Sequence, residues 1–312
     1  MIKHLLFYFI VYFMAANIWA QPSGEAMTLE TETGTLAGTL LYPEANDKVP
    51  VVLIIAGSGP TDRNGNNPMM TNNSLKMLAE GLFENKIASL RFDKRGIGES
   101  AGAMGKEIDL RFETYIEDAK AWADFLIKDT RFNEIVIMGH SEGSLIGMIA
   151  AREKGAAKFI SIAGPGVPAG EIIREQLKAQ PPFVTDLAYP ILDKMERGET
   201  QDSIPPMLNA LFRPSVQPYI ISWFKYDPQQ EIGKLNCPVL ILQGSTDIQV
   251  GVGDAEKLAT ANPKARKIIL EGMNHILKDA EADRMKNIAT YTDPKLPLKK
   301  GLIESIVTFM NE

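Results

Sequence analysis

The feature that most constrains the fold is a series of short, uninterrupted apolar runs that alternate with segments of helical spacing. The apolar runs lie at residues 49–56, 87–92, 134–138, 158–162, 239–242 and 267–270. A strand that is buried on both faces has this appearance, because neither face needs polar residues. Segments with helical spacing lie between them or follow them, at residues 75–83, 112–127, 144–152, 256–261 and 302–309. The alternation predicts an α/β fold with a mostly parallel, doubly wound sheet.

Two segments depart from this alternation of predicted strands and helices. Residues 27–34 and 35–42 alternate in polarity, which predicts an antiparallel N-terminal hairpin with a turn at Gly34. Residues 167–232 contain many prolines and no buried strand, and helices are expected at 171–177, 187–195, 206–212 and 219–224. We expect residues 21–166 and 233–312 to form the core and 167–232 to form a helical cap insertion. The alternative is an ordinary surface insertion.

The N-terminus has the layout of a secretory signal peptide. Lys3 provides a positive charge, residues 5–14 form an apolar run, and Ala20 is a plausible cleavage position. The apolar run is short for a membrane span, and an uncleaved anchor is the alternative. We therefore expect residues 1–20 to be removed. The mature chain would then be exported to the periplasm or secreted, without a stable membrane span.

Composition excludes several classes of partner and site. The formal net charge of -6 argues against a nucleic-acid partner. The single cysteine excludes an intramolecular disulfide, and with only three histidines no His/Cys metal cluster can be assembled. Residues 93–100 contain a Gly-x-Gly loop, but they lack the patterns of nucleotide-binding loops and are read as a turn that braces a site. We expect no metal and no cofactor.

The chemistry of the chain is indicated by the pentapeptide Gly139-His140-Ser141-Glu142-Gly143. It fits Gly-x-Ser-x-Gly and lies between a predicted strand and a predicted helix, which is the context of a nucleophile elbow. The sharp turn would raise the serine Oγ above the sheet at a helix N-terminus. A tight glycine-rich turn without a catalytic role is the alternative. We interpret Ser141 as the nucleophile.

A serine nucleophile needs a base, and few histidines are available. His4 lies in the expected signal peptide and His140 lies inside the elbow, so His275 is the candidate base. Asp247 follows the predicted strand at 239–242, where it could orient the base. The order Ser141, Asp247, His275 matches that of α/β-hydrolase triads. Asp254 is the rival acid, although its place at a helix start gives it a structural role.

An oxyanion hole would complete such a site. One donor is expected to be the backbone N–H of Glu142, the residue after the nucleophile. The second should come from the loop after an early strand, where Ser58 is the first candidate and Gly57 the alternative. Arg63 or Asn64, in the polar stretch that follows, would line the pocket or lie in a solvated loop.

These motifs resemble those of the EstD-like carboxylesterases, within the serine aminopeptidase-type (S33) branch of the α/β-hydrolase superfamily. The resemblance rests on residues 57–66, 93–100, 139–143, 237–247 and 274–275 and covers most of residues 27–312. One departure is Asn64, where many EstD-like loops have an acid. The superfamily contains esterases, thioesterases, peptidases and lipases, so the motifs are much less specific for substrate than for fold.

The resulting hypothesis is a serine hydrolase that cleaves small carboxylic esters through an acyl-enzyme. Apolar residues of the insertion should pack against the core, and a few would form an acyl pocket, which favours short or medium acyl groups. The first alternative is a peptidase or thioesterase with the same triad, and a peptidase would need an acid such as Glu171 or Glu175 to bind a free amino terminus. The second is a catalytically idle binding protein. Dehalogenases and epoxide hydrolases are disfavoured because their nucleophile is an aspartate.

Overall fold

The computed structural model describes residues 24–312, and the expected signal peptide therefore lies outside the described residues. An eight-stranded sheet forms the centre of the chain. Its strands are β1 (Glu25–Thr31), β2 (Gly34–Leu41), β3 (Val49–Ile55), β4 (Ala88–Phe92), β5 (Phe132–His140), β6 (Lys158–Ile162), β7 (Val239–Gly244) and β8 (Arg266–Leu270).

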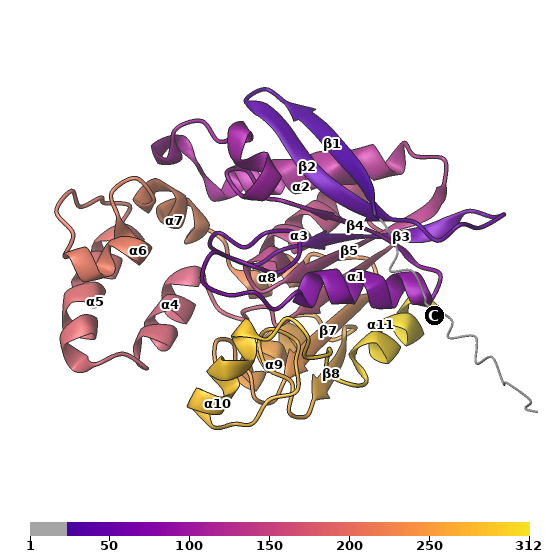
Figure 1. The fold of residues 1–312 in the computed structure, drawn as a ribbon. Helices are drawn as coiled ribbons and strands as arrows, with labels where there is room; N and C mark the ends of the chain where they lie inside the picture. Colours follow the sequence, from indigo (N-terminus) through magenta and orange to yellow (C-terminus); the bar gives the residue numbers. More distant parts are fainter. Residues whose placement is uncertain (1–23) are drawn as a thin grey trace, which may run out of the picture.

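The strand order is β1-β2-β4-β3-β5-β6-β7-β8. Strands β4, β3, β5, β6, β7 and β8 run parallel, while β2 is antiparallel to both β1 and β4. The predicted mostly parallel sheet and N-terminal hairpin are confirmed (Figure 1). The hairpin turn is at Glu32 and Thr33 and not at Gly34, which is the first residue of β2 and pairs with Thr31.

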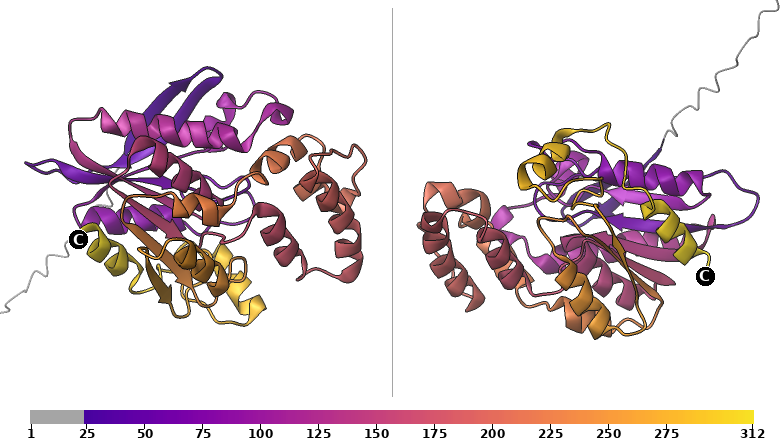
Figure 2. Two further views of the ribbon diagram at one scale, coloured as in Figure 1. Left: turned by 180° about the vertical axis from the view of Figure 1, so that it is seen from behind. Right: turned by 90° about the horizontal axis from the view of Figure 1, so that it is seen from below.

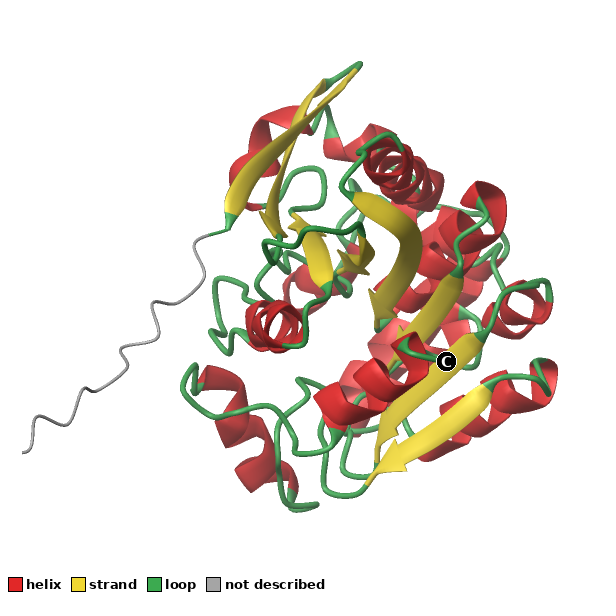
Figure 3. Cartoon of the chain, turned by 90° about the vertical axis from the view of Figure 1, so that its right-hand side faces the viewer, coloured by secondary structure: helices red, strands yellow, loops and turns green. Residues whose placement is uncertain are grey.

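Helices cover both faces of the sheet, as Figure 3 shows. Alternate residues of β3 face opposite layers: Leu53 belongs to one apolar core and Ile54 to the other. One layer contains α1 (Ser74–Glu84) and α11 (Leu302–Met310). The other contains α2 (Phe112–Ile127), α3 (Glu142–Lys154) and α9 (Val252–Ala261). Burial on both faces explains why the strands read as continuous apolar runs.

The segment between β6 and β7 is helical and stands at one end of the body (Figures 1 and 2). It comprises α4 (Ala169–Leu177), α5 (Pro182–Glu196), the 3₁₀ turn η3 (Pro206–Leu208), α6 (Asn209–Phe212), α7 (Gln217–Trp223) and α8 (Pro228–Gly233). Aromatic stacking attaches it to the core, because the rings of Phe112 and Trp223 lie 5.7 Å apart and nearly parallel. The last helix, α8, contacts α3 and α9 of the core.

The remaining short elements lie in loops at the edge of the core. They are the 3₁₀ turns η1 (Gly98–Ala103), η2 (Glu107–Asp109) and η4 (Thr290–Thr292), and the helix α10 (Arg284–Ala289). Among residues 24–312, every helix is too short or too polar to cross a bilayer.

Candidate active site

Ser141 occupies a strained turn between β5 and α3. Its backbone angles are φ 55° and ψ -124°, a conformation that residues other than glycine rarely adopt. The Ser141 N–H donates to the carbonyl of Ile162 at the end of β6, at 3.0 Å. The structure therefore places the predicted nucleophile at the carboxyl end of β5 and at the N-terminus of α3, with its side chain only partly covered.

The two glycines of the pentapeptide are required by close backbone packing. A Cβ at Gly139 would lie 2.1 Å from the Gly143 carbonyl oxygen, and a Cβ at Gly143 would lie 2.4 Å from the Ile55 carbonyl oxygen. Real Cβ atoms do not approach backbone so closely. The Gly-x-Ser-x-Gly pattern here is therefore a packing requirement of the turn that carries Ser141.

His275 and Asp247 meet as the sequence predicted. Asp247 follows β7 and His275 follows β8, and the carboxyl ends of these parallel strands lie at one edge of the sheet. His275 Nδ1 lies 2.8 Å from Asp247 Oδ2, with both side chains buried. A carboxylate at Nδ1 holds the ring in the tautomer that leaves Nε2 free to accept a proton.

The Asp247 carboxylate is fixed by further hydrogen bonds. Its Oδ1 accepts the N–H groups of Gln249 and Val250, at 2.8 and 3.0 Å. Its Oδ2 also accepts from the Gln243 side chain, at 3.2 Å. Burial acts to raise the pKa of Asp247, but the neighbouring His275 ring and the backbone N–H groups hold it below its ordinary value. Asp247 is therefore maintained as a carboxylate.

The rival acid Asp254 has a structural position. Its Oδ1 accepts the N–H of Gly166 at 2.9 Å, and its Oδ2 accepts the N–H of Gly251 at 3.1 Å, at the start of α9. Both oxygens thus bind backbone groups that a helix start and a neighbouring loop leave unpaired. This geometry supports Asp247 over Asp254 as the partner of His275.

His140 connects the elbow to the loop of His275. Its Nε2–H donates to the His275 carbonyl at 2.8 Å, and the two imidazole rings lie 4.8 Å apart. Through this contact the residue beside Ser141 borders the candidate base. Within residues 24–312, the hydrogen bonds do not include one between Ser141 Oγ and the His275 ring. Burial, with a smaller contribution from His275, lowers the pKa of His140 to about 3.

The depressed pKa predicts how stability depends on pH. Below pH 6.5 the unfolded chain gains a proton at His140 that the folded chain does not, so the free energy of unfolding falls as pH falls toward 3. Between pH 7 and pH 5 we expect the wild type to lose about 2 kcal/mol more than His140→Gln, which has no titrating ring. Urea unfolding at the two pH values measures this difference. Equal losses would contradict a neutral His140.

The loop after β3 borders the nucleophile. A Cβ at Gly57 would lie 3.1 Å from Ser141 Cβ and 3.3 Å from His140 Nδ1. Within the described chain, the backbone N–H groups of Ser58 and Glu142 donate to no other protein group. Neither N–H is thus committed to another group of the described chain, and the oxyanion hole expected at Ser58 and Glu142 stays a prediction.

The sequence did not single out Lys94, which lies between these two segments. Its ammonium donates to the Gly57 carbonyl at 2.6 Å and pairs with the Glu142 carboxylate at 3.2 Å, with both side chains almost fully buried. Three charged residues in succession directly after a buried strand, Asp93 to Arg95, were the available signal. A buried charge requires a partner of opposite charge, and the partner of Lys94 is Glu142 of the elbow.

Arg63 and Asn64 do not lie in a freely solvated loop, which was one of the two placements considered from the sequence. The Arg63 side chain forms ion pairs with Glu99 and Asp93, and Asn64 Oδ1 accepts from the buried Arg91 guanidinium. Asp93 also accepts the Arg63 N–H at 2.8 Å. The loop is thus tied to the segment after β4, so the expected bracing role of residues 93–100 agrees with the contacts.

The insertion closes over a small apolar void beside the elbow. Ile172 of α4 and Trp223 of α7 lie in its wall, together with Glu142, Leu145, Pro165, Val167, Ala169 and Pro228. Its volume is about 10 Å³. That space holds no more than about one water-sized group.

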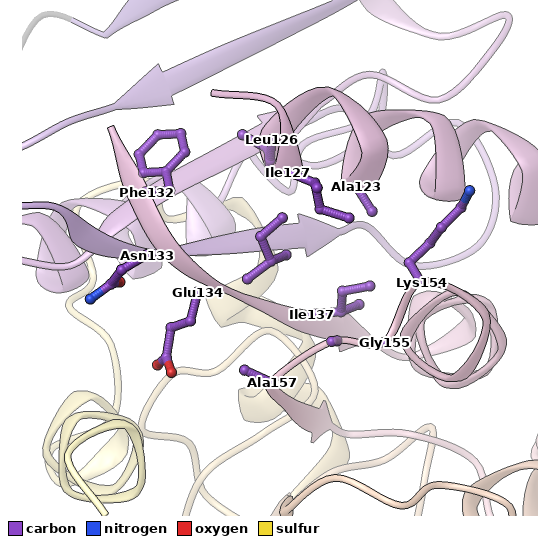
Figure 4. A pocket seen from close by; sticks show the side chains of 12 residues that line it. Ala123, Leu126, Ile127, Phe132, Asn133, Glu134, Ile137, Lys154, Gly155 and Ala157 are labelled. Atoms are coloured by element: carbon purple, nitrogen blue, oxygen red, sulfur yellow. The ribbon is translucent and has the colours of Figure 1, made fainter. Parts of the chain in front are cut away.

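A separate pocket of about 270 Å³ lies between α2, the start of β5 and the turn after α3. Figure 4 shows Phe132, Asn133 and Glu134 on one side of it and Lys154 on the other. These residues are at the amino ends of β5 and β6, the edge opposite Ser141. The residues that line it include no serine, cysteine or histidine, so it is not part of the candidate site.

In residues 24–312, no cluster of His, Cys, Asp and Glu is arranged to hold a metal ion.

The chain is similar in sequence to known hydrolases. Residues 71–195 match the family model described as serine aminopeptidase, S33. The chain is 26% identical to Esterase EstD of Thermotoga maritima in an alignment of 283 residues that covers 87% of this chain. It spans 63% of the length of that curated relative.

Solved structures show the same fold. Est1E from Butyrivibrio proteoclasticus, with ferulic acid bound, superposes with a TM-score of 0.65 at 20% identity, over 92% of this chain and 100% of that one. The α/β hydrolase GrgF from Penicillium sp. sh18 gives 0.59 at 20% identity, over 93% of this chain and 96% of that one. With this strand order and these structural neighbours, the chain has an α/β-hydrolase fold and is similar in sequence to Esterase EstD and to the serine aminopeptidase S33 family.

Proposed function

We propose that this chain is a serine hydrolase that cleaves small carboxylic esters through an acyl-enzyme. The observation that carries the proposal is His275, whose Nδ1 lies 2.8 Å from the buried Asp247 carboxylate and whose ring stands against the residue beside Ser141. A serine on a strained turn, a histidine and a buried acid at one edge of the sheet are the parts of a catalytic triad.

Acylation follows from these positions. Ser141 Oγ attacks the ester carbonyl carbon and transfers its proton to His275 Nε2, while the Ser58 and Glu142 N–H groups bind the carbonyl oxygen as it becomes negative. Collapse of the tetrahedral intermediate breaks the bond to the alcohol, which leaves with the proton from His275. The hydrogen bond between Ser141 Oγ and His275 Nε2 forms when substrate is bound, since catalytic hydrogen bonds are often long in the free enzyme.

In deacylation, water is the attacking group and Ser141 is the leaving group. Water enters, gives a proton to His275 and attacks the acyl carbon, and the same N–H groups bind the second oxyanion. The Ser141–acyl bond breaks, Ser141 recovers its proton from His275, and the carboxylic acid leaves. Asp247 remains ionised throughout and stabilises the imidazolium that forms in each half-reaction.

The insertion supports a preference for short or medium acyl groups. The void beside Glu142 has a volume of only about 10 Å³, and Ile172 and Trp223 lie in its wall. Both side chains are apolar and lie beside Glu142, the residue after Ser141, which favours a small apolar acyl group. A peptidase is less well supported, because Glu171 and Glu175 are both exposed on α4 and Glu175 pairs with Lys178.

The test is a substrate panel with active-site labelling. We expect residues 21–312 to hydrolyse p-nitrophenyl acetate faster than the matching thioester or an aminoacyl p-nitroanilide. A fluorophosphonate probe should label Ser141, as located by peptide mass spectrometry, and should abolish turnover. Faster cleavage of the anilide would make the chain a peptidase. Absence of both labelling and turnover would leave a binding protein.

A further inference from the structure

A buried ion pair lies directly behind the elbow. The side chains of Lys94 and Glu142 are 2% and 1% exposed, and Nζ lies 3.2 Å from Oε1. Nζ also lies 4.9 Å from the centre of the Tyr115 ring. Taking two charges out of water is expensive, and a buried ion pair is weak evidence for stability. This pair is therefore better explained by what it positions.

Each partner is attached to one of the two proposed oxyanion donors. Lys94 donates to the Gly57 carbonyl at 2.6 Å. Because the Gly57–Ser58 peptide is trans, its N–H points away from its carbonyl, and therefore away from Lys94. Glu142 carries the other donor in its own backbone. The ion pair thus joins the loop after β3 to the first residue of α3.

The peptide that Lys94 holds lies beside the nucleophile. A Cβ at Gly57 would lie 3.1 Å from Ser141 Cβ, so the loop backbone is next to the serine. Rotation of the Gly57–Ser58 peptide would break the Lys94 contact and turn the Ser58 N–H away from its present direction. Lys94 is the buried side chain that bonds to this carbonyl.

We propose that Lys94, held by Glu142, is a positioning residue that orients the Ser58 N–H for the oxyanion. The inference rests on the proposed function. An ammonium bound to the carbonyl also polarises the amide and strengthens its N–H as a donor, since linked hydrogen bonds reinforce one another. Lys94 therefore acts on the transition state through the Gly57–Ser58 peptide, without touching the substrate.

The test removes both charges, so that neither is left buried without a partner. Lys94→Met is combined with Glu142→Gln, which keeps the Glu142 backbone N–H. The matched control combines Arg95→Met with Asp118→Asn, which removes the buried ion pair between the residue after Lys94 and helix α2. The control pair touches neither Gly57 nor Glu142. Lys94→Leu combined with Glu142→Gln is a second test variant and carries the same expectation if the first does not fold.

We expect kcat for p-nitrophenyl acetate to fall by about 10- to 100-fold in the test variant, somewhat less than loss of a complete oxyanion donor. The Ki of an aryl trifluoromethyl ketone, which forms an oxyanion on Ser141, should rise by a similar factor. The KM and the Ki of the matching methyl ketone should not change. The control should keep all four values within a few-fold of the wild type.

Failure of the inference and failure of the proposed function give different results. If the test variants retain the wild-type kcat and trifluoromethyl ketone Ki, Lys94 does not position the donor. If test and control lose activity equally, the pair is structural and the inference is wrong. If the wild type neither hydrolyses the ester nor binds the trifluoromethyl ketone, the proposed function itself fails.

Discussion

Ser141→Ala is expected to lower kcat for p-nitrophenyl acetate by about 10⁴- to 10⁶-fold, because the proposed acyl-enzyme forms on the Ser141 hydroxyl. In the proposed mechanism Ser141 Oγ is the atom that attacks, and the strained turn at φ 55° holds Ser141 at the end of β5. Binding should persist, because the proposed oxyanion donors and the pocket wall are unchanged. Stopped-flow and steady-state assays on the purified variant measure the loss.

Ser144→Ala is the matched control for this substitution. Ser144 lies three residues later on α3, is fully buried, and shares a hydrogen bond of 2.7 Å with Ser161 Oγ. Its loss should reduce the free energy of unfolding by about 1–3 kcal/mol and leave kcat within a few-fold of the wild type. Wild-type turnover in Ser141→Ala, or a comparable loss in Ser144→Ala, would show that the nucleophile is elsewhere.

Most of the sheet could be predicted, because each buried strand is marked by a short apolar run in its own sequence. Strand β6 has the predicted bounds Lys158–Ile162, and helix α2 has the predicted bounds Phe112–Ile127. Strand β5 extends beyond the predicted 134–138 at both ends, because Asn133, Gly139 and His140 interrupt the apolar pattern without interrupting the ladder. The short helices α8 and α10 were not predicted, since six residues are too few for a helical period to show.

The meeting of Asp247 and His275 could also be predicted, for a topological reason. Each follows a buried parallel strand, and the carboxyl ends of such strands share an edge. The scarcity of histidine then left one candidate base. Their contact is present, while their catalytic roles remain predictions that the substitutions test.

The bracing contacts could not be predicted, because they depend on which strands are neighbours. Lys94 and Glu142 are 48 residues apart in the chain, and Arg91 and Asn64 are 27 apart. Each pair meets because β4 lies beside β3 and β3 lies beside β5. No local sequence pattern encodes the order of the strands. From the sequence alone, Lys94 and Glu142 therefore look like ordinary charged residues of the surface.

Asp247→Asn is expected to lower kcat by about 10⁴-fold while leaving the fold intact. The reason lies in the hydrogen bonds of the carboxylate. Asp247 Oδ1 accepts two backbone N–H groups, from Gln249 and Val250, so an asparagine would place its amide oxygen there. Its NH₂ would then face His275 Nδ1 and stabilise the tautomer that carries its proton on Nε2. In that tautomer His275 cannot accept the proton of Ser141.

Comparison with Asp254→Asn tests which of the two aspartates is the acid of the proposed triad. Asp254 binds the N–H groups of Gly166 and Gly251, so its substitution should cost about 1 kcal/mol of stability and little activity. Steady-state kinetics and thermal unfolding on both variants separate the two effects. If Asp254→Asn produced the larger fall in kcat, the acid of the triad would be Asp254. The 2.8 Å contact between His275 and Asp247 would then be structural.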